Sequence, residues 1–214
     1  MNEIKIDDII LELTSLHRQL NHLLFNNELK ELKINVADNI RSKNKLTKGH
    51  FEPRSKWEDE DMQIIIWTLS LNGDPFYVIE VLIHEMVHQW NYQNNIKDVE
   101  NNGRHNKKFR DVAIKVGLSI PKTIRGEGIN DHGKGFNRTS ISKDLMKILE
   151  KELDFNREVM QFKHQYALDY EPKSYNKRFS YYCACDYYKN VKFTISKKLN
   201  ILCKDCNVTF KIEQ

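Results

Sequence analysis

His84 and His88 lie four positions apart in the stretch His-Glu-Met-Val-His, and this spacing brings two imidazoles together only on an α-helix. Positions i and i+4 of a helix share one face about one turn apart, so both rings can reach a single ion. The preceding sequence favours a helix start, because Asp74 is a good N-cap residue and Pro75 suits the first turn. We therefore expect a helix from Pro75 to about Asn94 that carries two metal ligands.

Glu85, directly after His84, adds a carboxylate to this pair. Zinc lowers the pKa of a bound water to about 7, and a neighbouring carboxylate can accept the proton of that water. These parts suffice to hydrolyse an amide bond, with Glu85 as the general base. The alternative is a pair of exposed histidines without a role, since a five-residue pattern also occurs by chance. The context favours a metal site, because the stretch 63–71 predicts a strand on which the helix could pack.

A catalytic zinc ion commonly has three protein ligands and one open position. The compact arrangement HExxHxxGxxH is excluded here by Asn94, which leaves Glu100, His105 and His132 as later candidates. We favour His105, because a polar loop before it can turn the chain back and a helix predicted after it would hold it rigidly. His132 lies in a glycine-rich stretch, where it could contact substrate, support a ligand or have no role.

The rest of residues 1–169 predicts an α+β domain with a small antiparallel sheet. Apolar residues recur every three or four positions in the predicted helices, whereas alternating or β-branched stretches predict strands. The stretch 121–139 holds four of the eight glycines, so we expect it to be irregular. The expected helices are 7–25, 75–94, 107–116 and 142–166, the expected strands are 32–37 and 63–71, and 48–52 is a short strand or a turn.

All four cysteines fall within 24 residues near the C-terminus, as Cys183 and Cys185 followed by Cys203 and Cys206. Two close pairs separated by a longer excursion are typical of a zinc ribbon, in which four thiolates hold a structural ion. Two disulfides are the alternative, and they are disfavoured in a reducing compartment. We expect residues 170–214 to form this zinc-ribbon module, with strands over 189–196 and 208–212.

Charge is distributed unevenly along the chain. Residues 170–214 contain nine Lys/Arg and four Asp/Glu, a net charge of +5, whereas the remaining residues carry −1. Six of the nine tyrosines lie in the same module, and aromatic rings among cations suit single-stranded DNA. The alternative is a solvated basic face with the tyrosines as a miniature core, which we favour for Tyr181 and Phe193.

The sequence has neither an apolar run long enough to span a membrane nor the basic start and apolar centre of a secretory signal. We therefore expect no membrane partner and a cytoplasmic location.

The stretch from His84 to Leu118 resembles the SprT-like (Spartan-like) zinc metallopeptidases, in which an HExxH helix precedes a loop with a third histidine. The matching positions are Gly103, His105 and Phe109, and the loop residues 97, 98 and 100 are also similar to the family. Asn106 departs from the family, where a glycine often follows the third histidine. The resemblance covers roughly residues 10–120, and the cysteine module extends it.

This resemblance implies a zincin-like (minigluzincin) catalytic domain followed by a zinc ribbon, with one catalytic and one structural Zn²⁺. It implies a zinc metalloendopeptidase that cleaves peptide bonds in proteins, with DNA-bound or DNA-crosslinked proteins as candidate substrates. An alternative is a non-catalytic, zinc-containing adaptor that binds nucleic acid. A third possibility is a protease without any role at DNA.

Overall fold

The computed structural model describes residues 4–38, 47–54, 62–120, 122–123, 126–127, 136, 138–165, 167, 179–183, 185, 192–195 and 197–213. The chain forms two compact units, residues 1–170 (unit 1) and residues 171–214 (unit 2), which are described separately. Among the described residues, no helix is long and apolar enough to cross a membrane.

Unit 1 contains a three-stranded sheet in the order β1-β3-β2. Strands β1 (Lys33–Ala37) and β3 (Gln63–Trp67) are parallel, whereas β2 (Gly49–Glu52) is antiparallel to β3. The predicted antiparallel pairing is confirmed for β2 and β3 but is wrong for β1 and β3, so the sheet is mixed, with the most apolar strand, β3, at its centre. The prediction for β3 is also too long, since a 3₁₀ turn (Thr68–Ser70) follows Trp67.

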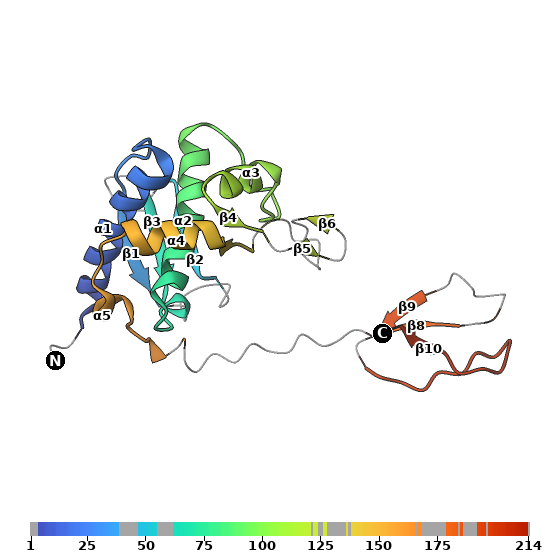
Figure 1. The fold of residues 1–214 in the computed structure, drawn as a ribbon. Coiled ribbons are helices and arrows are strands. Elements are labelled where there is room, and N and C mark those ends of the chain that lie inside the picture. Colours follow the sequence, from blue (N-terminus) through green and yellow to red (C-terminus); the bar gives the residue numbers. More distant parts are fainter. Residues whose placement is uncertain are drawn as a thin grey trace. The chain divides into compact units, whose positions relative to one another are not determined.

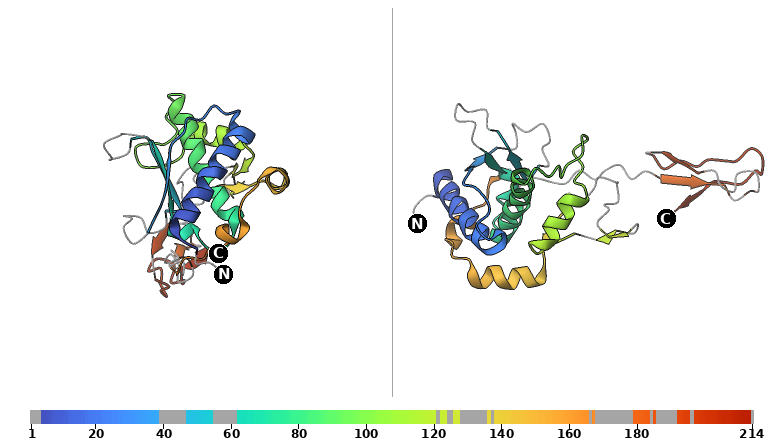
Figure 2. Two further views of the ribbon diagram at one scale, coloured as in Figure 1. Left: turned by 90° about the vertical axis from the view of Figure 1, so that its left-hand side faces the viewer. Right: turned by 90° about the horizontal axis from the view of Figure 1, so that it is seen from above.

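Two long helices cover one face of this sheet (Figures 1 and 2). Helix α1 (Ile6–Phe25) and helix α2 (Pro75–Gln93) lie close to their predicted bounds. The side chain of Asp74 caps α2 by accepting the backbone N–H groups of Phe76 and Tyr77, which confirms the predicted helix start. The core between the helices and the sheet contains fully buried aliphatic side chains that include Leu13, Leu16, Leu20, Ile64, Ile66, Ile79, Leu82, Ile83 and Met86.

The chain after α2 adds smaller elements. Helix α3 (Lys107–Lys115) matches its prediction, and β4 (Leu118–Ser119) pairs with β7 (Ser140–Ile141). In the glycine-rich stretch 121–139, the structure describes the two-residue strands β5 (Lys122–Thr123) and β6 (Gly126–Glu127), whereas His132 lies outside the described residues.

The helix predicted over 142–166 is wrong, because two helices replace it: α4 (Lys143–Glu152) and α5 (Arg157–Met160). The chain becomes extended at Leu153, and the Gln19 side chain of α1 then binds both the N–H and the C=O of Asp154. Asn156 caps α5 by accepting two backbone N–H groups. These alternative hydrogen bonds compensate for the helical ones that the break removes.

Unit 2 contains a second three-stranded sheet, in the order β10-β8-β9. Strand β9 (Lys192–Ile195) lies inside its predicted range, β10 (Lys211–Glu213) begins later than predicted, and β8 (Phe179–Tyr182) was not predicted. Tyr181 is fully buried and stacks on Phe193 with a centroid distance of 5.6 Å. Its hydroxyl also bonds the backbone of Leu199, which confirms that Tyr181 is a core residue.

Candidate metal centre

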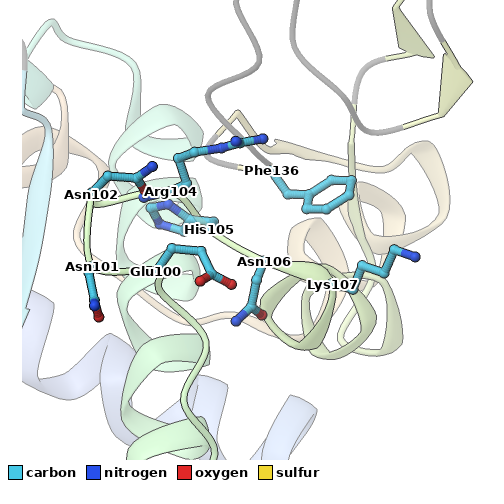
Figure 3. A pocket seen from close by; sticks show the side chains of 8 residues that line it. All are labelled: Glu100, Asn101, Asn102, Arg104, His105, Asn106, Lys107 and Phe136. Atoms are coloured by element: carbon cyan, nitrogen blue, oxygen red, sulfur yellow. Dashed lines mark hydrogen bonds between the residues drawn. The ribbon is translucent and has the colours of Figure 1, made fainter.

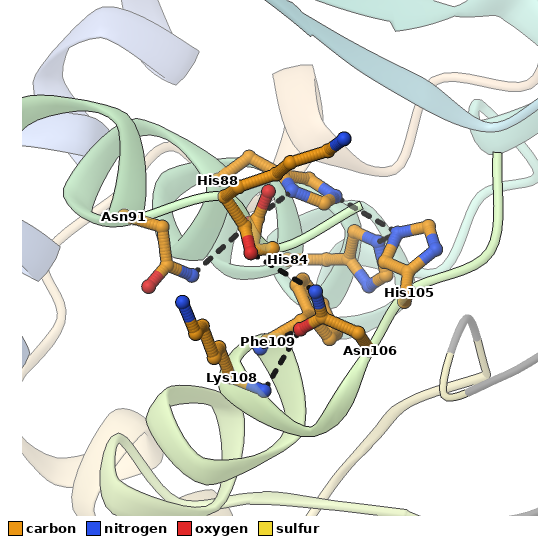
Figure 4. A network of polar contacts seen from close by, with 9 residues as sticks. His84, His88, Asn91, His105, Asn106, Lys108 and Phe109 are labelled. Atoms are coloured by element: carbon orange, nitrogen blue, oxygen red, sulfur yellow. Dashed lines mark hydrogen bonds and ion pairs between the residues drawn. The ribbon is translucent and has the colours of Figure 1, made fainter. Parts of the chain in front are cut away.

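The three predicted histidines of unit 1 converge with their Nε2 atoms (Figure 4). The Nε2 atom of His105 lies 3.1 Å from Nε2 of His84 and 2.9 Å from Nε2 of His88. Tetrahedral zinc with bonds of 2.0–2.1 Å would separate its nitrogen ligands by about 3.3 Å. The ring nitrogens are therefore spaced nearly as the ligands of one ion would be.

The ring of Phe109 forms the floor of this cluster. Its centroid lies 4.7 Å from those of His84 and His88, and 4.5 Å from that of His105. Phe109 is fully buried on α3, whose N-cap is Asn106. The side chain of Asn106 accepts two backbone N–H groups of α3 and donates to the carbonyl of Lys97. The residue that departs from the family pattern thus joins the histidine loop to the helix behind it.

The outer ring nitrogens of two histidines have hydrogen-bond acceptors. Nδ1 of His88 lies 2.7 Å from Oδ2 of Asp98, and because a carboxylate only accepts, this Nδ1 carries the proton. Nδ1 of His84 lies 3.1 Å from the hydroxyl of Thr139, which itself donates to Glu80. In neutral rings, Nε2 of both histidines is then an unprotonated acceptor.

Burial favours neutral imidazoles in this cluster. It lowers the pKa of His84 well below its ordinary value and lowers the pKa of His105 to about 3, with a further lowering by neighbouring His88 in both cases. The unprotonated Nε2 atoms of His84 and His88 both face Nε2 of His105. The single N–H that His105 could offer there cannot serve both lone pairs equally, whereas a bound cation could accept all of them. Three neutral imidazole nitrogens at this spacing fit zinc.

A tight hairpin after α2 places His105. Val99 and His105 face each other in an antiparallel bridge, and the amide of Asn106 donates to the carbonyl of Asp98. Gly103 occupies the turn with φ of +79°, a conformation that favours glycine. Glu100, the alternative ligand, is exposed on this hairpin and does not belong to the cluster of metal-ligating atoms.

Glu85 lies on α2 beside the first histidine and is only 6% exposed. Burial raises its pKa to about 7, although interaction with His88 and a hydrogen bond from the backbone N–H of Phe51 both lower it. Strand β2 approaches this carboxylate closely at Gly49, where an added Cβ would lie 2.7 Å from Oε1 of Glu85. The strand therefore fixes the carboxylate, and only glycine fits there without displacing it.

A cavity of about 560 Å³ borders His105 (Figure 3). Arg104 and Lys107 are exposed at this cavity, Glu100 also lines it, and Phe136 contributes a buried ring. The backbone N–H of Phe136 donates to the carbonyl of His105, so this wall is tied to the hairpin. The cavity thus lies against the hairpin that carries His105, and its lining does not include His84, Glu85 or His88.

The four cysteines of unit 2 form the second cluster of metal-ligating atoms. No disulfide joins these four described cysteines, and Sγ of Cys183 lies 3.3 Å from Sγ of Cys185 and 3.5 Å from Sγ of Cys206. Backbone N–H groups, first that of Cys206, lower the pKa of Cys203 to about 7. The arrangement fits a tetrahedral zinc ion, in agreement with the predicted ribbon.

The fold and the first cluster define an α+β protein with a candidate three-histidine metal centre, in which two histidines lie on α2 and the third on the hairpin that follows. Residues 13–126 match the SprT-like family, and the chain belongs to this family. No curated protein and no solved structure matches the chain. Family membership agrees with a metallopeptidase-like function and with the ligand pattern found at the centre.

Sequence analysis missed two contributors to the centre. Thr139 has no recognisable pattern and lies 55 positions after His84. Gly49 lies in the stretch 48–52, for which the sequence predicted a short strand or a turn but no contact with Glu85, because the close approach depends on the pairing of β2. Asp98 carried a signal, because its loop position is similar to the family, but its bond to His88 was not predicted.

Proposed function

We propose that this protein is a zinc metalloendopeptidase of zincin-like architecture, with a catalytic ion held by His84, His88 and His105. The observation that carries the proposal is the convergence of three Nε2 atoms near the buried carboxylate of Glu85. This carboxylate lies on α2, the helix that also carries His84 and His88. Family membership supports the metallopeptidase class.

The chain supplies the groups that a hydrolytic reaction needs. Zinc bound at the centre would supply a Lewis acid and lower the pKa of a water molecule. Glu85 would accept the proton of that water and return it to the nitrogen of the leaving amine. Burial raises the pKa of Glu85 in the metal-free chain, and a bound zinc ion would oppose this shift and favour the carboxylate form that acts as the base. We propose that a peptide substrate approaches along the hairpin of His105, where a cavity adjoins this histidine.

We further propose that unit 2 contains a structural zinc ion and brings the enzyme to DNA-bound or DNA-crosslinked proteins. Its net charge of +5 supports an anionic partner, and five lysines are exposed in the described part of the unit. Tyr181 is buried and cannot stack on a base, so the proposal depends on the cations and on the other aromatic residues. The exposed lysines are Lys192, Lys197, Lys198, Lys204 and Lys211.

The Glu85→Gln variant tests the proposed chemistry, because it keeps the shape of the side chain and removes the base. Zinc content and cleavage of a protein bound to single-stranded DNA would be measured together. We expect unchanged zinc and a rate lower by about 10²- to 10⁴-fold. Glu150→Gln, an exposed change on α4, should keep the wild-type rate. A Glu85→Gln variant as active as wild type would refute the proposal.

The alternative is a non-catalytic adaptor that binds nucleic acid, and the only observation that favours it is the basic charge of unit 2. It differs from the peptidase proposal in its prediction for cleavage. If the protein is an adaptor, His84→Ala should lose one zinc ion while DNA binding persists and no cleavage is found even in the wild type. The DNA role itself is tested by salt, because affinity for DNA that depends on phosphate contacts falls steeply as the salt concentration rises.

A further inference from the structure

The hydrogen bonds behind the metal centre differ between its two helical ligands. Oδ2 of Asp98 accepts from Nδ1 of His88 at 2.7 Å and from the side-chain amide of Asn91 at 3.0 Å. His84 instead meets the neutral hydroxyl of Thr139 at 3.1 Å. A charged acceptor forms the shorter and stronger hydrogen bond.

We propose that Asp98 is a positioning residue of the metal centre, which holds His88 with Nδ1 protonated and Nε2 free for the ion. The proposal rests on the metal site of the proposed function, but it assigns a role to a residue outside the ligand set. Carboxylates that accept from ligand histidines fix the orientation of the ring and increase its basicity.

The burial of this contact supports a positioning role. The side chains of His88 and Asp98 are only 13% and 14% exposed, so water competes little for the bond. Asn91 is fully buried, and among the described residues its Oδ1 has no hydrogen-bond partner. A buried acceptor without a hydrogen-bond partner is costly. The side-chain amide of Asn91 keeps this orientation because its N–H group donates to Asp98, although its Oδ1 then lacks a partner.

Asp98 also connects the two segments that carry the ligands. Its side chain bonds His88 on α2, while its backbone carbonyl accepts the amide of Asn106, directly after His105. One residue therefore sets the orientation of a helical ligand and the position of the hairpin that supplies the third ligand. Loss of its carboxylate should affect His88 directly, since the backbone carbonyl that accepts from Asn106 would remain, whereas loss of the Thr139 hydroxyl should affect His84.

The test uses the full chain and measures zinc affinity by competition with a chelator. His84→Ala gives the baseline for zinc held at the cysteine cluster. We expect Asp98→Ala to weaken zinc binding at the histidine centre by about 10- to 100-fold. Thr139→Val should weaken it less, and Thr139→Ser should bind as wild type. Asp111→Ala, which removes an exposed carboxylate from α3, is the control and should leave zinc affinity unchanged.

A second readout separates positioning from mere stability. In a nitrogen-15 spectrum of the histidine rings, the zinc-loaded wild type should show His88 with a protonated Nδ1 in a hydrogen bond, and Asp98→Ala should lose this signature. Unchanged zinc affinity in Asp98→Ala would overturn the proposal. If Asp98→Ala does not fold, Asp98→Asn replaces it, and wild-type affinity in that variant would overturn the proposal equally. Failure of the Glu85→Gln test would refute the peptidase function without changing these expectations.

Discussion

The histidine centre of unit 1 lies in a domain with an extensive apolar core, whereas the cysteine cluster of unit 2 lies in a small module. The described core of unit 1 draws on α1, α2, α3, α4 and the sheet. In the described part of unit 2, the buried side chains are Tyr181, Cys183 and Cys203. A module this small cannot bury enough apolar surface by itself, so its metal should contribute to folding. Unit 1 has an apolar core of its own, so an ion bound at its histidine centre would not be needed for folding and would be available for chemistry.

The two sets of donors also differ in charge. Three neutral imidazoles leave the double positive charge of zinc uncompensated, so the ion can polarise a further ligand. Four thiolates exceed the charge of the ion and complete its tetrahedral shell. The comparison predicts an open, reactive site in unit 1 and a closed, structural site in unit 2.

The largest expected effect follows loss of the cysteine cluster. We expect the double variant Cys203→Ser/Cys206→Ser to lose one zinc ion and to unfold residues 171–214, because structural zinc contributes about 10–16 kcal/mol in small zinc modules. Unit 1 should stay folded, and amide spectra together with zinc content would show both results. The matched variant His84→Ala should lose one zinc ion without unfolding either unit. A folded unit 2 in the double cysteine variant would contradict the comparison.

The next largest effect is expected at the floor of the histidine centre. Phe109→Ala should reduce the free energy of unfolding of unit 1 by about 3–5 kcal/mol, because a fully buried ring is replaced by a cavity. Urea unfolding of the metal-free chain, followed by tryptophan fluorescence, would measure it, since all three tryptophans lie in unit 1. Phe109→Leu is the control and should cost less. An unchanged urea midpoint for Phe109→Ala would show that the ring does not support the centre.

A smaller effect is expected where β2 meets Glu85. Gly49→Ala would place a Cβ atom 2.7 Å from both Glu85 and Val81, and we expect a cost of about 1–3 kcal/mol together with a slower cleavage rate. Gly103→Ala is a useful contrast, since its Cβ would meet nothing within 4 Å but its φ is +79°. That variant should lose about 1–2 kcal/mol through backbone strain and keep more activity. Equal cleavage rates for Gly49→Ala and wild type would contradict the account of Glu85.

The smallest effect concerns pH and buried His17, whose Nε2 lies 2.8 Å from Oε1 of Gln89. Burial lowers the pKa of His17 in the folded state below its ordinary value of 6.5. The unfolded state therefore binds the proton more readily, and the stability of unit 1 should fall as the pH falls below 6.5. The effect is about 1.4 kcal/mol for each unit by which the two pKa values differ.

His17→Gln can keep the hydrogen bond but cannot titrate, so it isolates this contribution. Urea unfolding of both proteins between about pH 7 and pH 5 should show a shallower loss of stability for the variant. Residues 171–214 contain no histidine, so unit 2 should lack this dependence. Identical pH dependence in wild type and His17→Gln would exclude the contribution of His17.

Features that depend on neighbours in sequence were predictable. A spacing of four places His84 and His88 on one face of a helix, and Asp74 and Pro75 mark the beginning of that helix, so α2 and the shared face of two candidate ligands were predictable. His105 could also be chosen as the third candidate ligand, because the loop after α2 can turn the chain back and the next helix begins shortly after this residue. The cysteine cluster was predictable for the same reason, because each pair of cysteines is close in the sequence.

Features that depend on distant residues were not predictable. The parallel pairing of β1 and β3 depends on which strand takes the centre of the sheet. The break after α4 depends on Gln19, 135 positions away from Asp154, because only the folded chain brings that side chain to the backbone. The bond between Thr139 and His84 likewise spans separate elements. Such contacts have no signature in hydrophobic periodicity.

The most direct test of the central claim is an anomalous-difference map recorded at the zinc edge from crystals of the full chain. We expect one peak at about 2.0–2.1 Å from Nε2 of His84, His88 and His105, and a second at about 2.3 Å from the four cysteine sulfurs. The first ion should keep a position open beside Glu85, and the second should not. A map without zinc among the three histidines, or with zinc there in a closed shell that excludes Glu85, would contradict the account.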